Sequence, residues 1–344
     1  MKMKKLFSYQ LMVSLLVALV LTISIPIKLS AGVKDLLIIH SYSRSESNKW
    51  VSEQSQGIRS GFANSDYVFH ELEMGTKKLP ADQFKTKAAE VYEQVKVIDP
   101  ALIFITDDNA LKLMVPKIGK KIPVVFMGVN ANIRLDYPWL LEYPNVTGIL
   151  ERPLIKRTLF LMKESLNLKP TKALLLLGTN QTGKAFLKIE LNNQQSFKLV
   201  SFEVDVKASG EVKQWQEWIK SSKSDGYDLV LATTFLGLTA PDGSKENTNV
   251  FVKWMSANSP VPVFTVHTDV IGYNKLVGGM VLNGILFGEE AAKIAHEILG
   301  EQKPPKSIPY KTLTKGQLIF SKQQLVKWGF VIDKSFMGEV VLVD

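Results

Sequence analysis

Polar and aromatic side chains follow short apolar runs in both halves of the sequence, and their types suit recognition of a small molecule. The runs at 36–39, 102–105 and 124–127 are followed by the candidate residues Ser41, Tyr42, Trp50, Asp107, Asp108 and Asn130. The runs at 174–177, 229–232 and 261–266 are followed by Thr182, Phe235 and Asp269. Hydroxyls, amides, carboxylates and a few aromatic rings together predict a site for a polar solute that has an apolar part.

Each of these groups has an expected role. The rings of Tyr42, Trp50 and Phe235 would stack on the solute, hydroxyls and amides would orient it, and an aspartate would hold a cationic group. The adjacent acids Asp107 and Asp108 also have a simpler interpretation, because Asp108 or its neighbour Asn109 could cap the helix that follows. Two adjacent acids allow both roles.

Other motifs argue against nucleotide, metal and hydrolytic sites. Residues 178–184 (GTNQTGK) fit the start of a phosphate-binding loop, but Ala185 stands where that loop has the hydroxyl that holds magnesium. His40 and His267 each follow an apolar run, and no metal-ligand spacing surrounds them. The sequence has no cysteine and no nucleophile elbow, so we predict no catalytic residue, no metal and no cofactor.

The elements that would position these residues alternate between strands and helices. Short apolar runs are separated by stretches of helical periodicity, such as Phe84, Ala88, Val91, Val95 and Ile98. This alternation predicts an α/β fold with a mostly parallel sheet covered by helices. Because parallel strands end at one edge of a sheet, the candidate residues would border a common space.

Length and a mid-chain interruption predict two Rossmann-like lobes. Some 313 residues follow the expected leader, which is too many for one typical core, and prolines and glycine interrupt the alternation at 137–148. The predicted parts are a signal peptide at 1–31, a first lobe at 33–145 plus about 278–302, and a second lobe at 146–275 plus about 303–344. Several crossings between the lobes would form a hinge.

The N-terminal residues predict export. Lys2, Lys4 and Lys5 precede an apolar run at 11–27, and small residues follow at 30–32, which is the order of a cleaved secretory signal. The alternative is a permanent membrane anchor, because the 17-residue run reaches the lower limit for a spanning helix. Without the four lysines of the leader, 38 basic residues stand against 33 acidic ones, and no basic stripe for nucleic acid is present. With no cysteine for lipid attachment, we expect free diffusion in a bacterial periplasm.

Several segments at the strand ends carry a family resemblance. They are 40–42 (HSY) with Trp50, 105–110 (ITDDNA), 125–130 (VFMGVN) and 145–148 (NVTG), joined by 288–300 and 325–330 near the end of the chain. They resemble a family of type I periplasmic binding proteins, the substrate-binding components of ABC transporters. This resemblance implies two lobes joined by a three-strand hinge, with a ligand such as an aromatic amino acid held between them. The chain departs from the family at 178–183, where an acidic residue is frequent.

Together these observations predict an exported, non-enzymatic solute-binding protein that works as a monomer. We expect it to capture a small polar or amphipathic molecule, such as an amino acid, and to deliver it to an ABC permease. Two alternatives stay open. The protein could be the ligand-detecting partner of a membrane sensor kinase or cyclase, or an exported hydrolase.

Overall fold

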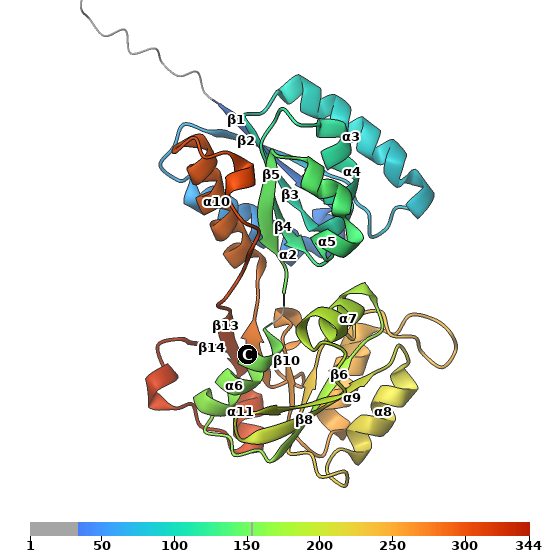
Figure 1. The fold of residues 1–344 in the computed structure, drawn as a ribbon. Helices are drawn as coiled ribbons and strands as arrows, with labels where there is room; N and C mark the ends of the chain where they lie inside the picture. Colours follow the sequence, from blue (N-terminus) through green and yellow to red (C-terminus); the bar gives the residue numbers. More distant parts are fainter. Residues whose placement is uncertain (1–33, 153) are drawn as a thin grey trace, which may run out of the picture. The chain divides into compact units, whose positions relative to one another are not determined.

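The computed structural model describes residues 34–152 and 154–344, and residues 35–344 form one unit (Figure 1). The predicted signal peptide at 1–31 lies outside the described residues. Within the described ranges, no helix combines the length and the apolar character that a membrane crossing requires.

Six parallel strands form the first sheet, in the order β12-β5-β4-β3-β1-β2. Their bounds are β1 Asp35–His40, β2 Val68–Glu73, β3 Leu102–Thr106, β4 Val124–Val129, β5 Val146–Leu150 and β12 Lys311–Thr312. Because every pair is parallel, the carboxyl ends of these strands lie along one edge of the sheet.

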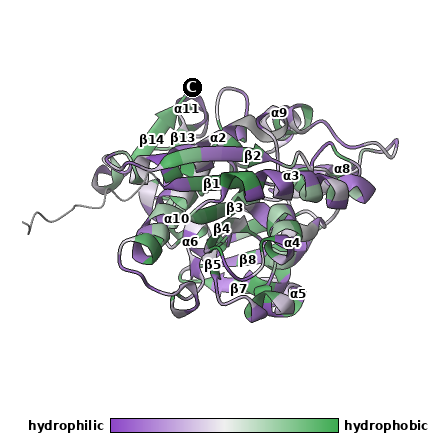
Figure 2. Cartoon of the chain, turned by 90° about the horizontal axis from the view of Figure 1, so that it is seen from above, coloured by the Kyte–Doolittle hydropathy of each residue, from purple (hydrophilic) through white to green (hydrophobic). Residues whose placement is uncertain are grey.

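Helices cover both faces of the first sheet. These helices are α2 Arg44–Gly61, α3 Phe84–Ile98, α4 Asp107–Ile118 and α10 Gly284–Leu299, and a short α5 Ile133–Asp136 follows β4. Leu37 of β1 packs in the core formed with α3 and α4, whereas its neighbour Leu36 packs in the core formed with α2 and α10. A strand buried on both faces needs an apolar residue at every position, which explains the unbroken runs coloured green in β1, β3 and β4 (Figure 2).

A second sheet has the order β10-β9-β6-β8-β7 and is parallel except for the antiparallel pair β7 and β8. Its strands are β6 Lys172–Leu177, β7 Ser196–Leu199, β8 Phe202–Ala208, β9 Leu229–Ala232 and β10 Val263–Thr265. The accompanying helices are α6 Ile155–Ser165, α7 Gln181–Ala185, α8 Val212–Ser221, α9 Thr248–Asn258 and α11 Lys322–Trp328. Leu175 packs with Leu159 of α6, and Leu176 packs with Trp215 of α8, so this sheet also has a core on each face.

A small third sheet joins the second lobe. Its order is β11-β13-β14, with bounds β11 Gly278–Val281, β13 Gln317–Ser321 and β14 Val340–Val343. Strand β11 is antiparallel to β13, and β13 is parallel to β14. Met280 of β11 and Phe320 of β13 belong to the same core as Leu175 of β6. The architecture is therefore two α/β lobes, as the sequence predicts.

Three connections join the lobes in the described part of the chain. They run between β5 and α6, between β11 and α10, and between β12 and β13. The first and third leave the first sheet, and the second returns the chain to it through α10, which is coloured orange among the blue and green elements of the first lobe (Figure 1). The predicted three-strand hinge corresponds to these connections.

The strand pairings place the lobe boundaries differently from the sequence prediction. β5 pairs with β4, so the first lobe includes 146–150 and does not end at 145. β11 pairs with β13 and therefore belongs to the second lobe, whereas β12 pairs with β5 and belongs to the first. The segment 146–150 follows two prolines and contains a glycine, and these residues are typical of a loop. The strand was therefore not predicted from the sequence. At Gly148 a Cβ atom would lie 2.1 Å from the carbonyl oxygen of Phe126, so only glycine fits beside β4.

Candidate functional site

Side chains that follow β1, β3, β4 and β5 contact one another at the carboxyl edge of the first sheet. Trp50 of α2 is hydrogen-bonded to Asp107. Asn130, which follows β4, is bonded through its backbone to Asp108 and through its side chain to Glu151. We refer to Trp50, Asp107, Asp108, Asn130 and Glu151 as the strand-end cluster. All of these residues except Glu151 are candidates predicted from the sequence.

Asp107 is buried at the start of α4. Its Oδ1 accepts a hydrogen bond from Nε1 of Trp50 at 3.1 Å, and the residue is 4% exposed. Its φ of 61° is a left-handed conformation, which costs of order 1 kcal/mol in a residue with a side chain. Burial, and next the negative charge of Glu151, raise the pKa of Asp107. A proton or a cationic partner would therefore stabilise this carboxyl group.

Asp108 holds the loop that follows β4. Its carboxylate accepts hydrogen bonds from the backbone N–H groups of Asn130 at 2.9 Å and Ala131 at 3.1 Å, and from the Tyr137 hydroxyl at 3.2 Å. Burial raises the pKa of Asp108, although these donors act in the opposite direction. The side chain thus bonds a neighbouring loop and not the start of its own helix, and Asn109 donates to Thr76 at 3.0 Å. Neither side chain acts as the helix cap that the alternative interpretation required.

The residues that follow β5 reach back to the same loop. Glu151 Oε2 accepts a hydrogen bond from Asn130 Nδ2 at 3.0 Å. The Arg152 guanidinium donates to the backbone carbonyls of Val129, Asn130 and Ala131 at 3.2, 2.9 and 2.8 Å. Burial, and next the charge of Asp108, raise the pKa of Glu151 to about 7. Residues 151 and 152 are therefore part of the site and also the start of the connection to the second lobe.

Sequence reasoning missed Glu151 and Arg152 because it interpreted the segment before them as a loop. The signal was weak, because only Ile149 and Leu150 directly precede these residues and Thr147 and Gly148 interrupt the apolar run. No group of three or more His, Cys, Asp or Glu side chains within residues 34–152 and 154–344 has a geometry suited to a metal ion.

Two other predicted residues of the first lobe lie at the end of β1. The Ser41 hydroxyl is buried, donates to the Thr106 carbonyl at 2.7 Å and accepts from the Ala110 backbone N–H at 2.7 Å. Its hydroxyl therefore connects β1 with α4. The Tyr42 ring is partly buried, and Nζ of Lys77 lies 4.4 Å from the ring centroid. Tyr42 keeps its candidate role as a ring beside the site.

The predicted residues of the second lobe lie in different environments. Phe235 is 2% exposed and packs edge-on against Trp215 and His267, with centroids 6.2 and 5.5 Å apart, so its ring belongs to a core. Thr182 is partly buried in α7. Asp269 is 75% exposed on its side chain, and its Oδ1 lies 3.6 Å from Nζ of Lys49. No hydrogen bond or ring contact between these three residues is found in the described part of the chain, in contrast to the strand-end cluster.

The loop at 178–184 is held by one hydrogen bond to Thr234 and one within the loop. Gly178 N–H donates to Thr234 Oγ1 and Gly183 N–H donates to Asn180 Oδ1, each at 2.8 Å. His267 Nε2 accepts from the Thr234 N–H at 3.3 Å, and burial lowers the pKa of His267 to about 4. The backbone amides of Gly178 and Gly183 are thus engaged with Thr234 and Asn180.

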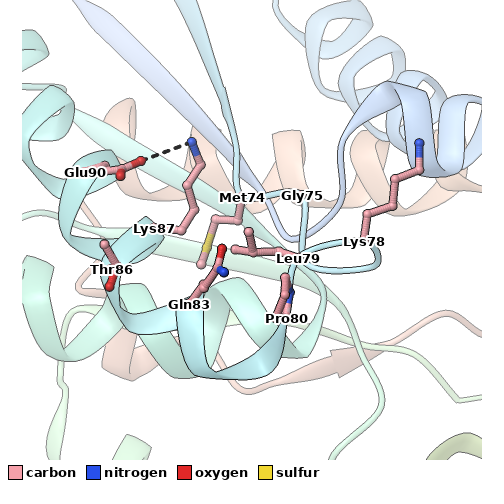
Figure 3. Close-up of a pocket in the computed structure, with 9 residues that line it drawn as sticks. All are labelled: Met74, Gly75, Lys78, Leu79, Pro80, Gln83, Thr86, Lys87 and Glu90. Atoms are coloured by element: carbon pink, nitrogen blue, oxygen red, sulfur yellow. Dashed lines mark hydrogen bonds and ion pairs between the residues drawn. The ribbon is translucent and has the colours of Figure 1, made fainter.

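A surface hollow of about 530 Å³ lies between the segment after β2 and helix α3 (Figure 3). The residues that line it are Met74, Gly75, Lys78, Leu79, Pro80, Gln83, Thr86, Lys87 and Glu90. Lys87 forms an exposed ion pair with Glu90 at 3.5 Å, and such a pair is well solvated. We place the candidate site at the strand-end cluster instead, because there the polar groups are buried or partly buried and converge from several strands.

Solved structures of binding proteins have a similar fold. The ligand-free, open structure of CD0873, a substrate binding protein with adhesive properties from Clostridium difficile, has a TM-score of 0.62 and 15% identity, covering 91% of this chain and 99% of that chain. The chain has the fold of a type I periplasmic binding protein. An ABC domain from Streptococcus pneumonia in complex with L-Trp has a TM-score of 0.55 and 15% identity, covering 91% and 100% of the two chains.

Sugar-binding proteins share the type I periplasmic binding fold. AraP, an arabinose binding protein from Geobacillus stearothermophilus, has a TM-score of 0.53 and 12% identity, covering 86% of this chain and 99% of that chain. No protein-family model and no curated protein sequence matches this chain. The similarity is therefore one of fold.

Proposed function

We propose that this protein is an exported solute-binding protein that captures a small polar or amphipathic molecule without chemical turnover. The observation that carries the proposal is the strand-end cluster. The buried carboxyl group of Asp107 and the partly buried carboxyl groups of Asp108 and Glu151 lie with Asn130 and Trp50 at the carboxyl edge of the first sheet. In open α/β sheets this edge is where ligands bind.

The composition of the site favours a solute with a polar or cationic group and an apolar part. Trp50 and Tyr42 supply rings, while Asp107 and Asn130 supply hydrogen-bonding groups. An amino acid has this combination, and one neighbour of the same fold is described in complex with L-Trp. Ser41, Thr182 and Asp269 remain candidate contacts, whereas we leave out Phe235 because its ring is buried in the second-lobe core.

Delivery to an ABC permease completes the proposal. The basic and apolar leader at 1–31 supports export, and the solved neighbours described above include substrate-binding proteins. The lobes would close on the solute through the three connections, as domain closure in other proteins excludes water from the bound ligand. Glu151 and Arg152 belong to the strand-end region and also begin the first connection. A solute bound there would therefore lie beside a segment that joins the two lobes.

Native mass spectrometry of the protein purified from its own host tests this proposal. We expect a small molecule bound in a 1:1 complex that is released on denaturation. The Asp107→Asn variant should lose this molecule, whereas Asp82→Asn, which changes an exposed acid of the same lobe, should retain it. If no molecule co-purifies and no compound of a broad metabolite library shifts the melting temperature, the proposed function is wrong.

A further inference from the structure

Thr234 joins the ends of three strands of the second sheet. Its N–H donates to Nε2 of His267 at 3.3 Å, its carbonyl oxygen accepts from Nδ2 of Asn180 at 3.0 Å, and its Oγ1 accepts from the Gly178 N–H at 2.8 Å. Thr234 follows β9, and its three partners follow β10 and β6. Because these strands are parallel, the contacts lie at the carboxyl edge of the sheet, where ligands bind in open α/β folds.

The contact with Thr234 determines which nitrogen of His267 carries the proton. A backbone N–H can only donate, so Nε2 has to be the acceptor. A neutral imidazole has one N–H and one bare nitrogen, and the proton therefore lies on Nδ1. Burial lowers the pKa of His267 to about 4, although the negative charge of Asp269 acts in the opposite direction, so the ring is neutral at pH 7. His267 thus carries a neutral N–H donor on Nδ1.

This donor has no partner in the described part of the chain. Among residues 34–152 and 154–344, no hydrogen bond from Nδ1 of His267 is found, and the residue is only partly buried. The two nitrogens lie on different sides of the ring, so Nδ1 faces away from the Thr234 amide. Phe235 packs edge-on against the ring, with centroids 5.5 Å apart, and helps to hold its plane. A polar group that is oriented in this way and left without a protein partner is typical of the groups that orient a ligand.

We propose that the Nδ1–H group of His267 donates a hydrogen bond to an oxygen acceptor of the bound solute. The inference rests on the proposed function and narrows its solute class to molecules with a carboxylate, carbonyl or hydroxyl oxygen. The sequence predicted that the Phe235 ring stacks on the solute, whereas here Phe235 supports the histidine that contacts it. A site built around a hydrogen-bond donor rejects solutes that leave the donor unpaired, because an unpaired buried donor is costly.

Nuclear magnetic resonance of the imidazole nitrogens tests the proton position and the solute contact together. The chain has four histidines, so two-bond proton–nitrogen spectra of the isotope-labelled full chain contain few signals, and His267→Gln assigns the ring. In the solute-free protein at pH 7 we expect the proton on Nδ1. The probe is the small-molecule extract that is released by denaturing the protein purified from its own host. Adding this extract should shift the Nδ1 resonance clearly more than the Nε2 resonance.

Two substitutions separate the donor from the contact with Thr234. The side-chain amide of glutamine overlaps the Nε2 end of a histidine, so His267→Gln keeps an acceptor for the Thr234 N–H and loses the donor at Nδ1. The shorter His267→Asn places its amide near Nδ1, so it keeps a donor there and loses the acceptor. We expect half-saturation to need about tenfold more extract for His267→Gln and at most about twofold more for His267→Asn. His70→Gln, in the first lobe, should bind like the wild type.

Three results would overturn the inference. They are a proton on Nε2 in the solute-free protein, an Nδ1 resonance that the extract does not move, and a larger loss of binding in His267→Asn than in His267→Gln. The last result is expected if His267 only holds Thr234 in place. The spectra of the wild type keep the test valid if a variant does not fold.

The identity of the co-purified solute separates this inference from the proposed function. A solute without an oxygen acceptor would refute the contact with His267 and leave the solute-binding function standing. If the extract is empty, the compound of the metabolite library with the largest shift in melting temperature replaces it as the probe. Absence of any co-purified solute, together with no response to that library, would refute the function itself.

Discussion

The indole Nε1 of Trp50 donates to Oδ1 of Asp107 at 3.1 Å, and this bond joins helix α2 to the start of α4 at the edge of the first sheet. Trp50 also packs edge-on against Phe287 of α10, with ring centroids 5.6 Å apart. One side chain therefore links a buried acid with two helices that come from opposite ends of the chain. The acid is held in position by the packing of the lobe.

Trp50→Phe removes the N–H donor and keeps an aromatic ring. We expect a loss of about 1–2 kcal/mol in the free energy of unfolding, because the Asp107 carboxylate loses its indole partner. The loss should be larger at pH 8 than at pH 5, since the bond is strongest when the carboxyl is ionised. Urea denaturation at both pH values measures it. Trp218→Phe, in a partly buried indole of α8, is the control, and an equal effect of the two substitutions would contradict the assignment.

Glu151 should make the protein less stable as the pH rises through its titration. Its folded pKa of about 7 lies above the ordinary value of 4.5, so the folded state binds more protons between these two values. Stability contributed by this group is therefore lost from pH 4.5 to pH 7, by at most about 3 kcal/mol. Glu151→Gln can still accept from Asn130, and we expect it to be more stable than the wild type at pH 8 but not at pH 5. Thermal denaturation at the two pH values tests this, with the exposed Glu90→Gln as control.

His267 should make the protein less stable as the pH falls. Its folded pKa of about 4 lies below the ordinary 6.5, so the unfolded state binds more protons between these values. Stability is then lost as the pH falls from 6.5 to 4, by at most about 3 kcal/mol. We expect His267→Gln, which retains an acceptor for Thr234, to lose less stability on acidification than the wild type. Denaturation curves at pH 7 and pH 4.5 measure this. An equal loss of unfolding free energy in wild type and variant between the two pH values would refute it. His70→Gln, at the edge strand β2, is the comparison.

Gly288→Ala should disturb the contact between α10 and α2. A Cβ atom at this position would lie 2.4 Å from the Gln54 carbonyl oxygen and 2.6 Å from the Ile58 nitrogen, so the helices would have to move apart. We expect a loss of about 3 kcal/mol in the free energy of unfolding, as for overpacked cores. Gly338→Ala, where nothing lies within 4 Å of the added atom, should change stability by less than about 0.5 kcal/mol. Chemical denaturation of both variants decides between these outcomes.

The fold class was predictable because burial on both faces of a parallel sheet leaves a continuous apolar run. Asp107, Asp108 and Asn130 were predictable for a related reason, since parallel strands end at one edge whatever lies between them. The lobe boundaries were harder to predict from the sequence. Glycine at 148 is required by close approach to β4, but in the sequence it resembles the loop residues around it.

The remaining side-chain positions depend on contacts that local sequence does not contain. Gln54 lies within α2, where glutamine usually faces solvent, yet it is buried, and Gly288 of α10, more than 200 residues later, packs against its backbone. Phe235 follows a strand like the other candidates. However, Thr234 before it has φ of 49°, and the chain turns so that the ring packs on Trp215.

The position of α10 in the chain also affects the order in which the protein can fold. Together with α2, this helix covers one face of the first sheet, but it follows most of the second lobe in sequence. A ribosome or a translocation pore that releases the chain from its N-terminus would therefore deliver β1 to β5, together with α2, long before α10. Until α10 is released, the apolar surface that it packs against stays exposed. The first lobe is therefore completed late in the biogenesis of the protein.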